Sequence, residues 1–286
     1  MKCPKCGKEF YVKDARHAFN EYFNDQIKYD KAFEKRICSD CAIAAIESGM
    51  NKATEDAEQF ESYKEEYEEK SSEEKTNHML KILDEVYDLA ITGVPFVSKS
   101  VEELAYDYST KTYGKTKEFD LAKAAKALIR NQIIKCGTSG FITGLGGLIT
   151  LPVAVPANIS SVLYVQIRMV ASLACLGGYD VHSDQVQSLV YACLAGKATA
   201  DILKPTGIKI GEKLAVNAID KIPGKVLIAI NKKVGFRLFT KFGEKGAINL
   251  GKMVPAVGGF IGGAFDATTT KAVGSAAYRL FIKGQL

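Results

Sequence analysis

Two Cys-x-x-Cys pairs in the first forty-one residues constrain the fold of this chain more than any other feature. Cys3 and Cys6 form the first pair, and Cys38 and Cys41 form the second. A two-residue gap lets both thiolates of a pair face one ion, and Gly7 allows the tight turn that exposes backbone amides to sulfur. The pairs together supply four ligands of a tetrahedral site, so we expect one structural Zn²⁺ per chain. Because four thiolates leave no open position for water, we do not expect a catalytic zinc.

The alternative interpretation of these cysteines is a redox-active Cys-x-x-Cys motif. A thioredoxin-like site needs such a pair at the start of a helix that follows a strand, and no such pattern surrounds either pair. The chain has seven cysteines, an odd number that suits metal ligation in a reducing compartment better than a disulfide framework. The N-terminus lacks the apolar segment of a secretory signal peptide. We therefore expect a cytoplasmic protein.

Length and charge divide the chain into three parts. Its 286 residues, 47% of them hydrophobic, allow roughly two domains with a substantial core. We assign residues 1–50 to a zinc-ribbon-like module, residues 51–78 to a charged linker or helix, and residues 79–286 to the main domain. From Thr54 to Lys75 there are ten acidic and three basic residues, whereas from Leu203 to Lys252 there are eleven basic and three acidic residues. This asymmetry indicates a solvated acidic segment and a basic face for an anionic partner.

Apolar residues in the main domain recur at helical spacing. Prolines stand at the expected helix starts and glycines at the expected ends. One helix carries the stripe from Met79 to Leu89, and Ser100-x-x-Glu103 is a capping box that opens the next. Further helices are expected over residues 121–133, 156–176, 183–203, 208–219, 223–242 and 255–282. No segment alternates with a period of two residues, so we predict an all-α main domain, a glycine-rich multi-helix bundle.

Residues 136–167 contain no charged side chain, a length that is compatible with a membrane span. However, Pro152 and Pro156 interrupt the stretch, and Arg168 would lie midway along the helix that follows. An arginine at the bilayer centre costs about 2.5–3.5 kcal/mol on insertion scales. We therefore favour a hairpin buried in the core of a soluble domain over insertion into a membrane.

Two glycine-rich segments predict close helix packing. In the second of them, glycines stand four residues apart in two pairs: Gly258, Gly259, Gly262 and Gly263. Each glycine costs a helix about 1 kcal/mol relative to alanine, so packing must compensate for this loss. The expected partner is the segment with Gly140 and Gly144. Packing within the chain is the favoured interpretation, and an interface inside a membrane is the alternative.

Two charged residues, Arg168 and Asp266, stand alone in apolar surroundings. One hypothesis is a buried ion pair that fixes the register of two helices. The other is that each side chain reaches the surface separately. The sequence favours neither.

A basic stripe follows Pro223. Lys233, Arg237, Lys241 and Lys245 recur every four residues, and apolar residues recur one position later. This pattern is typical of an amphipathic helix that lies on anionic lipid or against an acidic partner. The alternative is a core-facing helix with an ordinary solvated lysine face.

No catalytic motif stands out. The segment 137–141 lacks the final glycine of a nucleophile elbow, and the segment 144–149 departs from the dinucleotide-binding fingerprint. We therefore favour a non-enzymatic role. One alternative is an enzyme with an unfamiliar polar site around Arg168, Asp180 and Asp266. The other is nucleic-acid binding by the N-terminal module through its basic residues Lys2, Lys5, Lys8, Lys13 and Arg16.

Several long motifs of the main domain occur in a characteristic order. They are the segment 140–152 (GFITGLGGLITLP), the step from Gln166 to Arg168, Gly178-Tyr-Asp180, and the segments 234–246 and 254–266. With these motifs the chain resembles the EcsC family of bacteria, from about Leu80 to the C-terminus. The N-terminal module lies outside this similarity. The resemblance supplies no catalytic residues, but it implies a cytoplasmic protein at or near a membrane, since the family is named after a protein encoded beside an ABC-type exporter.

These observations together predict a two-module, non-enzymatic protein with one structural Zn²⁺. The zinc module would contact a protein partner. The EcsC-like helical domain would associate with an anionic membrane surface, or with a membrane complex of the ABC-exporter type, at the inner face of the plasma membrane.

Overall fold

The computed structural model describes residues 1–33, 36–48, 51, 70–95, 97–111, 119–136, 157–206, 219–240 and 259–285. The side chains of residues 31, 157–161 and 259–266 are not among those described. Within these ranges the secondary structure is helical, and the only β-contact is an isolated bridge between Lys2 and Glu9. The predicted all-α main domain is confirmed.

The N-terminal module has a small core of its own. It comprises α1 (Val12–Tyr22), α2 (Tyr29–Ala32) and a helical segment over residues 39–48. The ring of Phe19 packs edge-on against Tyr29 and Phe33, with centroids 5.7 and 5.8 Å away, and all three side chains are buried. Edge-to-face aromatic pairs contribute more than their buried area alone. This aromatic cluster holds α1 and α2 together.

The main domain is a bundle around one central helix, α8 (Ala157–Leu176). Five α-helices of the described part of the chain pack against it: α4 (Ser72–Thr92), α5 (Val101–Ser109), α6 (Leu121–Cys136), α9 (Asp184–Leu194) and α14 (Gly259–Ala277). Every residue of α8 from Val162 to Ala174 is buried. A helix that is mostly apolar on all sides belongs in the centre of such a bundle, and the few polar side chains of this stretch, Gln166, Arg168 and Ser172, are buried with it.

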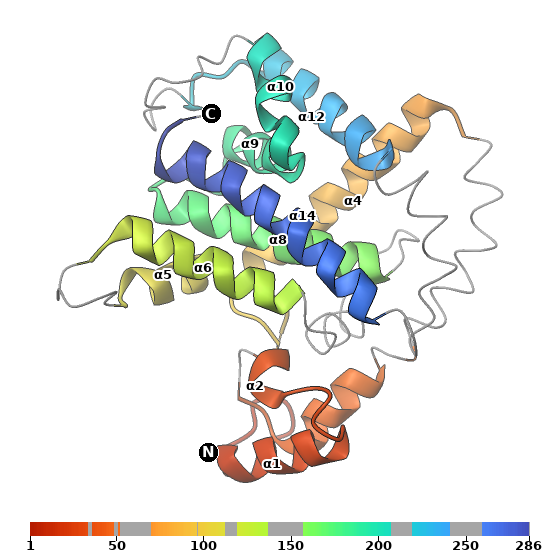
Figure 1. Ribbon diagram of the computed structural model, residues 1–286, viewed down its shortest axis with the longest axis vertical. Helices are drawn as coiled ribbons and strands as arrows, with labels where there is room; N and C mark the ends of the chain where they lie inside the picture. Colours follow the sequence, from red (N-terminus) through yellow and green to blue (C-terminus); the bar gives the residue numbers. More distant parts are fainter. Residues whose placement is uncertain are drawn as a thin grey trace.

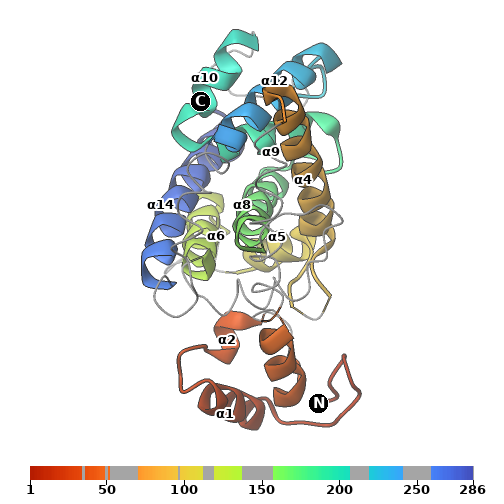
Figure 2. The same cartoon turned by 90° about the vertical axis from the view of Figure 1, so that its right-hand side faces the viewer.

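Shorter elements and one further helix complete the domain. The helix α12 (Gly224–Phe239) packs against α4 and α9. The chain between α9 and α12 contains η1 (Gly196–Ala198), α10 (Thr199–Leu203) and η2 (Lys204–Thr206), and α14 continues as the π-helical turn η4 (Tyr278–Ile282). The N-terminal module lies at one end of the long axis and α10 and α12 lie at the other (Figures 1 and 2). In Figure 2, α14 and α4 lie on opposite sides of α8.

Local capping signals place several helix boundaries. The predicted capping box of Ser100 and Glu103 is present, and a second box of Ser71 and Glu74 opens α4. Ser183 caps α9, accepting a hydrogen bond from the backbone N–H of Val186. Each cap satisfies donors that would otherwise stay without partners at a helix start.

The single helix predicted over residues 183–203 is wrong. Gly196 has a φ of +60°, a left-handed conformation that ends α9 before α10 begins. The Thr199 hydroxyl donates to the carbonyls of Ala192 and Gly196, which stabilises the break. The predicted helix over residues 208–219 falls outside the described residues, apart from Ile219.

The uncharged stretch is described only in part. Residues 137–156 lie outside the described residues, and residues 157–167 form the first half of α8. Among the helices that the structure describes, none combines the length and the apolar character needed to cross a bilayer.

Gly93 ends α4 in a backbone conformation, φ +79° and ψ 159°, that is open essentially to glycine alone. An added Cβ would lie 2.6 Å from the carbonyl carbon of Lys99. We expect Gly93→Ala to lower the free energy of unfolding by at least about 3 kcal/mol, from strain plus overlap. Gly178 is the control, since its φ is +84° but no atom lies within 4 Å of its added Cβ. Gly178→Ala should lower the free energy of unfolding by about 1–2 kcal/mol. Urea denaturation measures both variants, and equal losses would contradict an overlap between the Cβ at position 93 and Lys99.

Candidate metal centre and basic face

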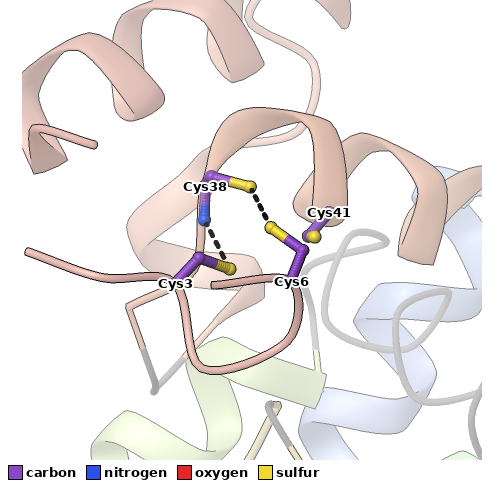
Figure 3. A group of neighbouring side chains, drawn as sticks. All are labelled: Cys3, Cys6, Cys38 and Cys41. Carbon is purple, nitrogen blue, oxygen red and sulfur yellow. Dashed lines mark hydrogen bonds between the residues drawn. The ribbon is translucent and has the colours of Figure 1, made fainter. Parts of the chain in front are cut away.

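The four predicted cysteines meet at one point. Their sulfur atoms all lie within 4.8 Å of one another, and Figure 3 shows the side chains turned toward a common centre. The Sγ atoms of Cys6 and Cys38 are 3.6 Å apart. Four Zn–S bonds of about 2.3 Å at tetrahedral angles place sulfurs roughly 3.8 Å apart, whereas a disulfide needs about 2.05 Å. The cluster therefore fits a tetrahedral metal ion.

The first pair lies in a tight turn. The backbone N–H of Gly7 donates to the carbonyl of Cys3 at 2.8 Å, and the N–H of Cys3 donates to the carbonyl of Lys8 at 2.8 Å. Gly7 has a φ of +77°, which favours glycine at this corner. The tight turn predicted at Gly7 is thus present.

The second pair opens a helix. Cys38 directly precedes the helical segment 39–48, and the N–H of Ala42 donates to its carbonyl at 3.0 Å. The backbone around Ile37 is fixed by Tyr29, whose hydroxyl bonds to both the carbonyl and the N–H of Ile37. The positive end of the helix therefore faces the sulfur cluster, where it stabilises negative charge.

The thiols differ in how readily they ionise. Burial raises the pKa of Cys3, but backbone N–H groups of Cys38, Cys6 and Lys5 outweigh it and hold the pKa at about 6. The N–H of Cys38 lies 3.4 Å from the Cys3 sulfur. In contrast, burial raises the pKa values of Cys38 and Cys41 above the ordinary thiol value. Four thiolates therefore require a bound cation, and a divalent metal ion supplies that charge.

Several basic side chains of the module, two of the proposed nucleic-acid contacts among them, are paired with acids. Lys8 contacts Asp40 at 2.7 Å, Arg16 contacts Asp30 at 2.6 Å, and Arg36 also pairs with Asp30. Residues 1–48 contain nine basic and eight acidic residues in all. The alternative of nucleic-acid binding through Lys8 and Arg16 is weakened, because two of its five proposed contacts are already neutralised.

Arg168 is fully buried in α8 and does not reach the surface. Its Nε and Nη2 both donate to the backbone carbonyl of Lys99, at 3.2 and 2.9 Å. The guanidinium thus holds the turn between α4 and α5 against the central helix. Asp266 lies in α14 but its side chain is not described, so the ion pair with Arg168 stays a prediction.

Asp180 does not join Arg168 in a polar site. It is exposed in the turn between α8 and α9, where its carboxylate accepts from the N–H of His182 at 2.9 Å. Eight helical residues separate Arg168 from the end of α8, a rise of about 12 Å. Asp180 therefore shapes the turn, and the enzymatic alternative loses one of its three residues.

The helix α12 separates apolar and basic residues as predicted. Val234 and Leu238 are buried, whereas Lys233 and Arg237 are exposed. Lys241 and Lys245 lie outside the described residues. The exposed side contains more than the sequence analysis identified, and we call it the α12 basic face: Lys225, Ile228, Lys232, Lys233, Phe236 and Arg237. Ile228, Lys232 and Phe236 follow one another at intervals of four residues. This spacing was the sequence signal that could have revealed the other members of the face.

Two features make the α12 basic face unusual. Ile228 and Phe236 leave 59% and 51% of their surface exposed. Lys232 lies 4.0 Å from Glu73, while the other three cations form no ion pair among the described residues. Exposed apolar side chains thus alternate with unbalanced positive charge.

The glycine pairs are described only in part. Gly259, Gly262 and Gly263 lie in α14, whereas Gly140, Gly144 and Gly258 fall outside the described residues. The predicted contact between the two segments stays a prediction. Another glycine, Gly274, allows a close approach of α14 to α6, because an added Cβ there would lie 2.8 Å from Ile129.

The family model described as the EcsC protein family matches residues 41–283. This chain belongs to the EcsC family. The match begins at Cys41, well before Leu80, so it overlaps the end of the cysteine cluster. No curated protein and no solved structure shows a significant match to this EcsC protein.

Proposed function

We propose that this EcsC protein binds anionic membrane surfaces peripherally through the α12 basic face. The observation that carries the proposal is the alternation of exposed Ile228 and Phe236 with Lys225, Lys233 and Arg237 on one side of α12. Apolar side chains of this kind enter the boundary between headgroups and acyl chains, while the cations contact anionic headgroups. The proposal places the protein on the inner face of the plasma membrane.

We further propose that the ion of the cysteine cluster is a structural Zn²⁺. Four thiolate ligands at tetrahedral spacing favour zinc over hard cations, which prefer oxygen ligands. The N-terminal module lies at the opposite end of the long axis from α12 (Figure 1). A protein attached to the membrane through α12 would therefore present the zinc module to partners away from the lipid.

Sedimentation with vesicles of phosphatidylglycerol and phosphatidylcholine tests the lipid proposal. We expect the protein to bind anionic vesicles at low salt and to leave purely zwitterionic ones unbound. K225Q/K233Q/R237Q should lower the partition coefficient about a hundredfold, since each cation near an anionic surface contributes about 1 kcal/mol. I228S/F236S should lower the binding that persists at high salt, because the apolar contribution is not screened.

The matched control removes charge elsewhere. K13Q/K111Q/K197Q changes three exposed cations outside α12, and we expect its vesicle binding to follow the wild type. An equal loss in this control would mean that net charge alone governs binding, and no vesicle binding of the wild type at low salt would refute the proposal.

A further inference from the structure

The helices α6 and α14 form a second basic surface that neither helix forms alone. They run antiparallel, because Ile129 of α6 lies against Gly274 while Cys136, seven residues later, bonds to Thr270. Exposed cations line the outer side of the pair, and we call this set the α6–α14 surface: Lys123, Lys126, Arg130, Lys271, Arg279 and Lys283.

Positive charge on the α6–α14 surface is not balanced. Residues 121–136 and 267–285 contain no acidic residue. Asp120, at the start of α6, contacts Lys123 at 3.1 Å. The other five cations form no ion pair among the described residues; Lys126 and Lys283 instead lie 5.9 Å from the ring centroid of Tyr278. The surface therefore offers net positive charge to an anionic partner.

The α6–α14 surface suits an anionic protein segment better than a lipid bilayer or the bases of a nucleic acid. The large exposed apolar side chains beside it among the described residues are Phe119, just before α6, at 50%, and Ile134, near the end of α6, at 40%. These two side chains stand before Lys123 and after Arg130, whereas Ile228 and Phe236 stand among the cations of α12, as in a helix that lies on a bilayer. Because two lysines lie against Tyr278, that ring is not a free platform for stacking bases. Lys123, Lys126 and Arg130 are separated by three and four residues, so they lie on one face of α6. Carboxylates on one face of an acidic helix have the same spacing, so the two sets match.

The chain itself contains a complementary segment. Residues 54–69 include eight acidic residues and one basic residue. The segment leads into α4, which lies on the opposite side of α8 from α14 (Figure 2). We propose that the α6–α14 surface of one copy binds the acidic segment 54–69 of a second copy. The contact is reciprocal in a symmetric dimer, so each association forms it twice.

Sedimentation velocity of the full chain at about 50 and 500 mM NaCl tests this contact. We expect a dimer at low salt and a monomer at high salt, because exposed charge pairs are screened. K126E/R130E/K271E and E61K/E65K/E68K should each be monomeric at low salt, since like charges then oppose one another. A mixture of the two variants should restore a dimer, because both contacts again join opposite charges.

The control K225E/K233E/R237E makes the same charge change on α12 and should leave the dimer intact. A monomeric wild type at low salt would overturn the proposal, as would a mixture that fails to associate. Dissociation of the α12 control would also overturn it, because the acidic segment would then bind α12. Loss of binding to phosphatidylglycerol vesicles in K126E/R130E/K271E, with the dimer unchanged, would assign the surface to lipid instead. This inference does not depend on the proposed membrane function.

Discussion

Removing the metal from the cysteine cluster should unfold the N-terminal module while leaving the helical bundle folded. Structural zinc sites contribute about 10–16 kcal/mol of apparent binding free energy, more than the total stability of most small domains. The core of this module around Phe19 is small, so it cannot replace that contribution. Elemental analysis should give about one zinc per chain. After chelation, the tyrosine and phenylalanine signals of the module should lose their dispersion by NMR.

Variants separate the ligands from the other cysteines. Cys38→Ser should lower the zinc content and unfold the module, because Cys38 is one of the four clustered sulfurs. Cys175→Ser is the matched control, since Cys175 lies in α8 outside the cluster, and it should retain the metal. A chelated protein whose module keeps its NMR dispersion would contradict a structural zinc.

Replacement of Arg168 should have the second largest effect. Arg168→Ala removes two hydrogen bonds to the carbonyl of Lys99 and leaves a cavity in the centre of the bundle. We expect the free energy of unfolding to fall by about 3–5 kcal/mol. Arg168→Lys should recover only part of this loss, because an ammonium group does not present the planar donor fork of arginine. Guanidinium chloride denaturation followed by circular dichroism measures these differences.

Two comparisons define what the Arg168 result means. Arg130→Ala, at an exposed position of α6, should change stability by no more than about 0.5 kcal/mol. A double-mutant cycle of Arg168→Leu and Asp266→Leu tests the predicted ion pair, and simple additivity would exclude it. A loss for Arg168→Ala no larger than that for Arg130→Ala would contradict the central structural role of Arg168.

Signals within a few residues of one another predicted much of the fold. The Cys-x-x-Cys pairs located the four-cysteine cluster that could hold a metal ion, and Ser100 and Glu103 located the start of α5. The helix α4 begins at Ser72, within the segment assigned to a charged linker or helix and before the apolar stripe at Met79. Its first turn is exposed and has no apolar residue, so apolar periodicity alone does not locate this start. The capping box at Ser71 was the available signal.

Local sequence patterns could not predict contacts between residues that are far apart in the sequence. The sequence left open whether Arg168 pairs with Asp266 or reaches the surface, and it could not predict that the guanidinium donates to a backbone carbonyl 69 residues away, because a carbonyl has no signature in sequence. The pairing of α6 with α14 likewise depends on packing around α8. Exposed Ile228 and Phe236 were missed because an isolated apolar residue in a helix is ordinarily assigned to the core.

Cell fractionation tests the central claim, peripheral attachment through charge and a few apolar side chains, most directly. The account predicts that the protein sediments with the plasma membrane in low-salt buffer and that a wash at about 1 M NaCl releases most of it, because salt screens the α12 cations. Recovery of the wild type in the soluble fraction at low salt would contradict the account. Retention through both the salt wash and alkaline carbonate would do so as well, because it would indicate insertion into the bilayer.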